Sequence, residues 1–142
     1  MSFLQLDSLA KTYPDGTEAV RGVDLCCQRG ELIVLLGPSG CGKTTTLRMV
    51  AGLEKPSAGR ILLEDVDMAS WPPQRRDVGF VFQFYALYPH LTVRENVSVP
   101  LGNRALSADA QVQLVEAMAE RLGIEALLDC YLHFFLLSFV HN

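Results

Sequence analysis

The stretch Gly37-Pro38-Ser39-Gly40-Cys41-Gly42-Lys43-Thr44 fills every position of the pattern G-x-x-x-x-G-K-[ST], which is typical of loops that hold nucleotide phosphates. That pattern requires a buried strand before the loop and a helix after it. The apolar run 32–36, bounded by turn residues, predicts a strand buried on both faces. The run 43–51 predicts a helix that ends at Gly52. The pattern and its flanks together favour a phosphate-binding loop over an ordinary glycine-rich turn.

The residue types of this loop match the chemistry of phosphate binding. Glycines allow the positive φ angles that let successive backbone N–H groups point at one anion. The helix that begins near Lys43 adds the positive end of its dipole, and the Lys43 ammonium can reach the β and γ phosphates. The Thr44 hydroxyl is a hard oxygen ligand of the kind that Mg²⁺ prefers. The loop therefore predicts a nucleotide with Mg²⁺.

The loop alone does not name the nucleotide, because GTPases and small kinases carry the same pattern. A GTPase would show a downstream Asn-Lys-x-Asp sequence that reads guanine, and the printed chain holds none. This absence favours the other classes of P-loop protein.

The bulk composition is typical of one folded domain. The chain has 142 residues, of which 49% are hydrophobic and 20% charged. A net charge of −4, with no clustered basic run, argues against nucleic acid as a partner. The N-terminus lacks the pattern of a secretory signal, and no run reaches the roughly 20 apolar residues of a membrane span. Four cysteines without metal-ligand spacing are predicted to be reduced thiols: Cys26, Cys27, Cys41 and Cys130.

Other local patterns predict an α/β domain. Residues 14–17 and 28–31 read as turns, and the runs 60–63 and 78–82 read as strands. Further along, Ser107 predicts the N-cap of a helix that Gly123 ends, followed by a short helix over 125–129. The expected apolar face of the longer helix consists of Val112, Val115, Ala119 and Leu122.

Three spaced segments, 37–53, 78–83 and 85–97, resemble the ATP-binding subunits of ABC transporters, and most of all the importer ATPases for sugars, sulfate and polyamines. The resemblance implies a P-loop NTPase fold with a RecA-like core, the antiparallel β subdomain of ABC proteins and the start of a helical subdomain. It assigns residues 1–83 to the nucleotide-binding part and 84–129 to the helical start, and leaves 130–142 as a divergent apolar tail.

The resemblance also implies roles for single residues. Tyr13 matches the aromatic that stacks on adenine, although packing is the alternative for a lone tyrosine before a turn. Val20 either packs on the same ring or belongs to the core. Gln83 matches the glutamine that reaches Mg²⁺ and the attacking water. The implied catalytic residues are Lys43 and Gln83, and the implied Mg²⁺ ligands are Thr44 and Gln83. The implied nucleotide-binding residues are Tyr13, Gly37, Pro38, Ser39, Gly40, Cys41, Gly42, Lys43, Thr44 and Thr45.

The implied cofactors are ATP and Mg²⁺, and the implied partners are membrane permease subunits and a second ATPase subunit. Partners of this kind imply that the protein lies in the cytoplasm, on the inner face of the cell membrane. Tyr85, Leu87, Tyr88 and Pro89 form either an apolar patch for the permease or part of the helical core. The three histidines His90, His133 and His141 are interpreted as non-catalytic.

The resemblance stops near Asp129. The sequence that follows contains no Leu-Ser-Gly-Gly-Gln signature, no Walker B aspartate, no catalytic glutamate and no switch histidine. Phosphoryl transfer needs an oriented water and positioned charge around the γ phosphate, so hydrolysis is not expected from this chain. A shifted reading frame or a premature stop is one hypothesis for the change in composition. The interpretations left open are an incomplete importer ATPase, a module that binds MgATP without turnover, a non-functional fragment and an ABC ATPase outside transport.

Overall fold

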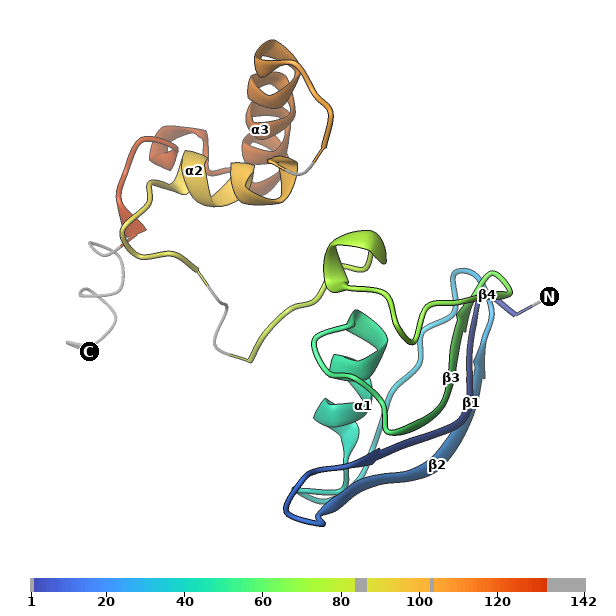
Figure 1. Ribbon diagram of the computed structural model, residues 1–142. Coiled ribbons are helices and arrows are strands. Elements are labelled where there is room, and N and C mark those ends of the chain that lie inside the picture. The colour runs from blue at the N-terminus through green and yellow to red at the C-terminus, as the bar shows by residue number, and fades with distance from the viewer. Residues whose placement is uncertain (1, 84–86, 103, 133–142) are drawn as a thin grey trace. The chain divides into compact units, whose positions relative to one another are not determined.

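The computed structural model describes residues 2–83, 87–102 and 104–132. Its contacts divide the chain into two compact units, Met1–Phe80 and Val81–Asn142. The first unit is a small sheet with one α-helix, and the second is built from helices (Figure 1). Each unit is described by itself.

The first unit is organised by a 4-stranded sheet in the order β2-β1-β3-β4. The strands are β1 (Leu4–Thr12), β2 (Glu18–Cys27), β3 (Ala58–Leu63) and β4 (Val66–Asp67), and all pairings are antiparallel. The predicted turn at 14–17 is confirmed, because the Tyr13 amide donates to the Thr17 carbonyl at 2.9 Å. Strand β3 begins before its predicted start at Arg60, because Ala58 already pairs with Ala10 of β1.

Helix α1 (Lys43–Ala51) packs its buried face on this sheet (Figure 1). Its predicted end is confirmed. Gly52 takes a left-handed conformation with φ of 78° and donates its amide to the Met49 carbonyl, while Leu53 donates to Arg48 at 2.9 Å. The core of the unit consists of Leu6, Leu9, Val20, Met49, Ile61 and Met68. Burial of Met49 among strand residues therefore fixes the helix that follows the phosphate loop.

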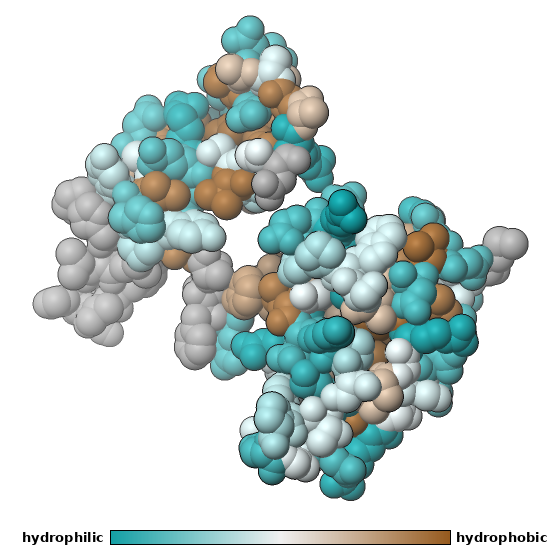
Figure 2. Space-filling view, in the orientation of Figure 1, coloured by the Kyte–Doolittle hydropathy of each residue, from teal (hydrophilic) through white to brown (hydrophobic). Residues whose placement is uncertain are grey.

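The two predicted apolar strands, 32–36 and 78–82, are wrong for this structure. Neither run takes up strand conformation, and Leu36 is 87% exposed. A strand buried on both faces needs paired neighbours and cover on each side. Within the described residues, the paired strands are β1 to β4, and none of them pairs with either run. Apolar side chains of both runs are therefore exposed, and Figure 2 shows apolar residues at the surface of the molecule.

The second unit contains α2 (Val93–Ser98) and α3 (Ala108–Leu122). Short 3₁₀ turns occur at Val99–Leu101 and Glu125–Leu127, and a further one lies at Pro73–Arg75 in the first unit. The predicted α3 is confirmed at both ends. The Ser107 side chain accepts from the Ala110 amide at 3.3 Å, and Gly123 is left-handed.

The predicted apolar face of α3 is only half correct. Val115 and Ala119 are buried with Val93 and Leu128, as expected of a helix face that meets a core. Val112 and Leu122 are exposed. The predicted helix over 125–129 is a single 3₁₀ turn.

The first residues of the expected divergent tail pack on this unit. The Val93 amide donates to the Cys130 carbonyl at 2.9 Å, Tyr131 forms a β-bridge with Thr92, and Leu132 lies against the core. Residues 133–142, with His133 and His141, lie outside the described residues. No helix in the described part of the chain has the length and apolarity of a membrane span. All four cysteines are free thiols.

A capping box begins α2, and it predicts a measurable pH effect. The Thr92 hydroxyl accepts from the Glu95 amide at 3.2 Å, while the Glu95 carboxylate accepts from the Thr92 amide at 2.7 Å. The bond from the Thr92 amide, and after it a bond that the Thr92 hydroxyl donates to the Glu95 carboxylate at 3.0 Å, hold the pKa of Glu95 below its ordinary value of 4.5. A depressed carboxyl pKa contributes stability that is present above the ordinary value and is lost as pH falls through the depressed pKa.

We therefore expect Thr92→Ala to destabilise the second unit by about 1 kcal/mol at neutral pH. The difference from wild type should shrink in acid, as Glu95 becomes protonated. Urea unfolding followed by far-UV circular dichroism, at pH 7 and below the ordinary carboxyl pKa, measures both values. An equal loss at the two pH values would rule out a contribution from the bond between the Thr92 hydroxyl and the Glu95 carboxylate.

Candidate functional site

The loop 37–42 curves ahead of α1 because its glycines take backbone conformations that other residues avoid. Gly42 is the N-cap of α1 with φ of 90°, and Gly37 has φ of 154°. A Cβ on Gly42 would lie 2.3 Å from the Ala19 carbonyl oxygen of β2. The loop therefore passes too close to β2 for any side chain at this position.

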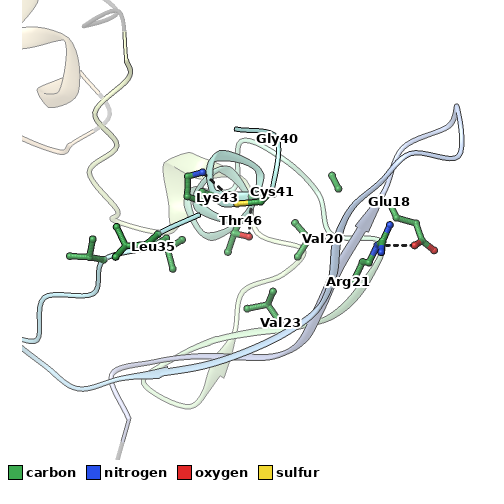
Figure 3. Close-up of a pocket in the computed structure, with 13 residues that line it drawn as sticks. Glu18, Val20, Arg21, Val23, Leu35, Gly40, Cys41, Lys43 and Thr46 are labelled. Atoms are coloured by element: carbon green, nitrogen blue, oxygen red, sulfur yellow. Dashed lines mark hydrogen bonds and ion pairs between the residues drawn. The ribbon is translucent and has the colours of Figure 1, made fainter. Parts of the chain in front are cut away.

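Lys43 reaches back over the curve of the loop. Its Nζ donates to the carbonyl oxygens of Gly37 at 2.8 Å and Pro38 at 2.7 Å. The same Nζ lies 3.4 Å from Cys41 Sγ, and Figure 3 shows this contact. An ammonium has three donor positions, and all three face loop atoms here. The cation is thus held at the mouth of the curve, where an anion bound to the loop amides would meet it.

The threonines of the first turn of α1 have different surroundings. Thr44 is exposed and Thr45 half-buried, whereas Thr46 is buried. The Thr46 hydroxyl donates to the Gly42 carbonyl at 3.0 Å and locks the first turn to the loop. Sequence reasoning did not single out Thr46. Its position four residues after the last loop glycine, where a hydroxyl can bond back along the helix, was the available signal.

A cavity of about 550 Å³ opens between the loop and β2. The loop and helix contribute Gly40, Cys41, Gly42, Lys43 and Thr46, and the other wall holds Val20 and Val23 of β2 with residues 34–36. Figure 3 shows Val20 and Val23 on the side of β2 that faces α1. The ion pair Arg21–Glu18 of the same strand, at 3.1 Å, also lines the cavity. The cavity thus combines Lys43 and the Arg21–Glu18 ion pair with apolar walls, and a few polar groups among apolar ones are the usual lining of a small-molecule site.

Tyr13 lies at the end of β1, at the turn that leads into β2. It is half-buried, and the Lys11 ammonium lies 5.0 Å from the centre of its ring. Lys11 is itself paired with Glu54 at 2.5 Å. Tyr13 does not line the cavity beside the loop, so the structure does not bring its ring together with Lys43. Val20, in contrast, does line that cavity while it also belongs to the core.

Gln83 belongs to the second unit and is exposed. Its position relative to the phosphate loop is not part of what the structure describes, so its role stays a prediction. Of the expected apolar patch, Tyr85 lies outside the described residues, whereas Leu87, Tyr88 and Pro89 are exposed. The described part of the patch is therefore surface, and the core alternative does not hold for it.

The segment that carries this patch is fixed by Asn96. The Tyr88 amide donates to Asn96 Oδ1 at 2.9 Å, and Asn96 Nδ2 donates to the carbonyls of Tyr88 at 3.0 Å and Thr92 at 2.9 Å. The His90 ring meets the Tyr88 ring edge to face at 6.1 Å. One amide side chain on α2 therefore presents Tyr88 and its neighbours at the surface.

Arg76 is a further residue that sequence reasoning missed. It is 2% exposed, and its guanidinium donates to carbonyls of Met49, Val50, Ala69 and Trp71. Burial lowers its pKa, and Asp67 opposes this shift. Its cation lies at the negative C-terminal end of α1, where it complements the helix dipole. The adjacent Arg75 is exposed, so the sequence alone does not distinguish the two arginines.

Metal ligands in this site would come from hydroxyl and phosphate oxygens. In the described part of the chain, no three or more His, Cys, Asp or Glu side chains lie together as a candidate metal site. The exposed Thr44 hydroxyl next to Lys43 is a donor of the type that Mg²⁺ takes when it is held mainly by a bound triphosphate. The loop and Thr44 thus fit a nucleotide that carries its own Mg²⁺.

Comparison with known proteins agrees with this site. The ABC transporter family model matches residues 20–138. The chain is 49% identical over 129 residues to the sn-glycerol-3-phosphate import ATP-binding protein UgpC of Roseobacter denitrificans, covering 91% of this chain and 36% of the relative. It is 45% identical to the trehalose import ATP-binding protein SugC of Mycobacterium tuberculosis, covering 91% and 33%. The chain therefore spans about a third of the length of these relatives.

Solved structures give the same fold. The cbiO1 protein of Clostridium perfringens, part of the ABC transporter complex cbiONQ, superposes with a TM-score of 0.72 at 32% identity, covering 92% of this chain and 54% of that one. A dimeric ATP-binding cassette bound to ADP and Pi gives 0.77 at 28% identity, covering 90% and 61%. The fold is that of a P-loop NTPase, with the small antiparallel sheet of these proteins. The phosphate loop before α1, the sheet and the family match together show that this chain belongs to the ABC transporter family and carries part of its ATP-binding domain.

Proposed function

We propose that the chain binds MgATP through residues 37–45, as part of the ATP-binding subunit of an ABC-type importer. The observation that carries the proposal is the curved loop at the start of α1, with the Lys43 ammonium held over its carbonyls. The loop amides and the helix dipole would receive the phosphate oxygens, and Lys43 would pair with the β and γ phosphates. The similarity to importer ATP-binding proteins supports transport over other ABC roles.

Thr44 and Gln83 are proposed to complete the Mg²⁺ coordination, and Tyr13 to stack on adenine. Support for Thr44 comes from its exposed hydroxyl on the first turn of α1. Support for Tyr13 comes from its place at the hairpin beside β2, whose Val20 lines the cavity near the loop. Stacking needs only a flat π face, which the half-buried ring of Tyr13 retains.

The proposed partners are permease subunits of an importer and a second ATPase subunit, at the cytoplasmic face of the membrane. The exposed Leu87, Tyr88 and Pro89, held by Asn96, support a docking role for the start of the proposed helical subdomain 84–129. No nucleic-acid partner is proposed, because the chain carries a net charge of −4.

We further propose that the 142-residue chain holds MgATP without hydrolysing it. Lys43 and Thr44 can bind and neutralise phosphates, but an oriented water also needs an acceptor beside the γ phosphate. The chain offers no carboxylate in a recognisable Walker B context for that task. Binding without turnover is the outcome that these residues support.

The test measures binding and turnover on the same preparation. We expect equilibrium dialysis with labelled ATP and Mg²⁺ to show saturable binding by the chain, and phosphate release to equal that of Lys43→Ala. Phosphate release well above that control would overturn the proposed lack of hydrolysis. A folded chain that binds no ATP would overturn the function itself and favour a non-functional fragment.

A further inference from the structure

Arg76 joins the far end of the phosphate-loop helix to the connector that follows the sheet, which we define as residues 69–73. Its Nη1 donates to the carbonyls of Met49 at 2.7 Å and Val50 at 3.0 Å, near the end of α1. Its Nε donates to the Trp71 carbonyl at 2.9 Å, and its Nη2 donates to that of Ala69 at 3.2 Å. One planar, rigid cation therefore binds carbonyls of two segments at once.

The packing around this guanidinium leaves it little freedom. Arg76 is buried, and a Cβ on Gly52 would lie 2.6 Å from its Nε. The left-handed glycine that ends α1 thus leaves room for the guanidinium to approach the helix. Because the Arg76 side chain is held tightly, a shift at the end of α1 must be passed on to the connector.

The opposite end of α1 carries contacts that a bound phosphate would replace. Lys43 now donates to the Gly37 and Pro38 carbonyls, and a phosphate would be a stronger, charged acceptor for the same ammonium. Gly42 provides no side-chain cap for the first turn of α1. Exchange of the carbonyls for phosphate oxygens would release the loop carbonyls from Lys43, and the bond from the Thr46 hydroxyl to the Gly42 carbonyl would carry that change into the first turn of the helix.

Helix α1 is short enough to transmit such a movement. It has 9 residues, which makes it about 13 Å long at the usual rise per residue. Met49 is fully buried in the core, so the helix is held against the sheet as one rigid element between its two ends. A packed helix that meets a ligand site at one end and a buried cation at the other is the kind of element that can couple two sites.

We propose that Arg76 is a positioning residue that couples nucleotide binding at the start of α1 to the conformation of the connector 69–73. This inference rests on the proposed MgATP binding and adds a second, distant response to it. The coupling acts in both directions, because an effect of the nucleotide on the connector implies an equal effect of the connector on nucleotide affinity.

The fluorescence emission of Trp71 can report the proposed coupling. It is the only tryptophan of the chain, and its own carbonyl accepts from Arg76. Its side chain is partly exposed, so a change in the connector alters the contact of the indole with water. Titration of the full chain with MgATP, with excitation where the nucleotide does not absorb, should give a saturable change in tryptophan emission. Its midpoint should equal the Kd from equilibrium dialysis.

The decisive comparison uses Arg76→Lys, with Arg76→Gln as a second variant and Arg75→Gln as the matched control. Lysine keeps a cation at the end of α1, but its single ammonium cannot reach the carbonyls of both segments. We expect folded Arg76→Lys to bind MgATP within about tenfold of wild type and to lose at least about two thirds of the emission change. Arg75 is an exposed neighbour, so Arg75→Gln should respond like wild type.

Each outcome decides between the two proposals. Bound ATP without any emission change in the wild-type chain would overturn the coupling, and this holds even where Arg76→Gln fails to fold. A full emission change in folded Arg76→Lys would overturn the part of Arg76. Absence of ATP binding in dialysis would instead overturn the proposed function.

Discussion

Replacement of Lys43 by alanine is expected to weaken MgATP binding by at least about a hundredfold. A hydrogen bond between a charged donor and a charged acceptor contributes about 1.5–3 kcal/mol, and Lys43 can give two such bonds to the β and γ phosphates. Each 1.4 kcal/mol is about a tenfold change in Kd. Alanine also removes the ammonium that now ties the Gly37 and Pro38 carbonyls together. Equilibrium dialysis with labelled ATP measures the change.

Lys55→Ala is the matched control for this substitution. Lys55 is an exposed lysine of the same unit, so its loss changes the net charge equally without touching the loop. We expect its Kd to stay within about twofold of wild type, because one exposed charge adds little at physiological salt. Far-UV circular dichroism checks that both variants fold. Equal weakening by the two variants would show a general charge effect and would contradict the role of Lys43.

The second large effect is on stability, and it is expected from Leu9→Ala. Leu9 is fully buried in β1, so truncation leaves a cavity among the core residues and should cost about 3–5 kcal/mol. The same substitution at Leu36, which is 87% exposed, should change the free energy of unfolding by less than about 0.5 kcal/mol. The two leucines differ in burial and not in chemistry, so they form a matched pair.

Urea unfolding followed by Trp71 emission measures this pair. Trp71 is the only tryptophan and lies in the first unit, so its signal reports the unit that contains both leucines. A cost at Leu36 that approaches the cost at Leu9 would show that residues 32–36 are buried in solution. That result would restore the strand that the apolar pattern of this run predicts.

The elements predicted correctly depend on neighbours in sequence. Helix α1 begins after Gly42 and ends at Gly52, since both glycines take left-handed conformations that few other residues adopt. Ser107 and Gly123 bound α3 for the same kind of local reason. The phosphate loop belongs to this group too, because its backbone path follows from glycine spacing and from the helix that it precedes.

The errors concern segments whose structure depends on distant partners. The run 32–36 has the composition of a buried strand, but a strand exists only where another strand offers its backbone groups. In the described residues, the strands that pair within the sheet are β1, β2, β3 and β4. The prediction that Val112 and Leu122 of α3 are core residues was wrong for a related reason. Helical spacing shows which residues share a face of the helix, but it does not show which element packs on that face.

The sequence by itself determined the phosphate loop, the helix after it, the ends of α3 and the resemblance that the family match confirms. Only the tertiary structure decided which apolar residues are buried, that Lys43 rests on the Gly37 and Pro38 carbonyls, and that Arg76 binds two segments at the end of α1. The physical reason is the range of the interactions. Turn, cap and helix preferences act over a few residues, whereas burial and the partners of a buried cation arise only when distant parts of the chain meet.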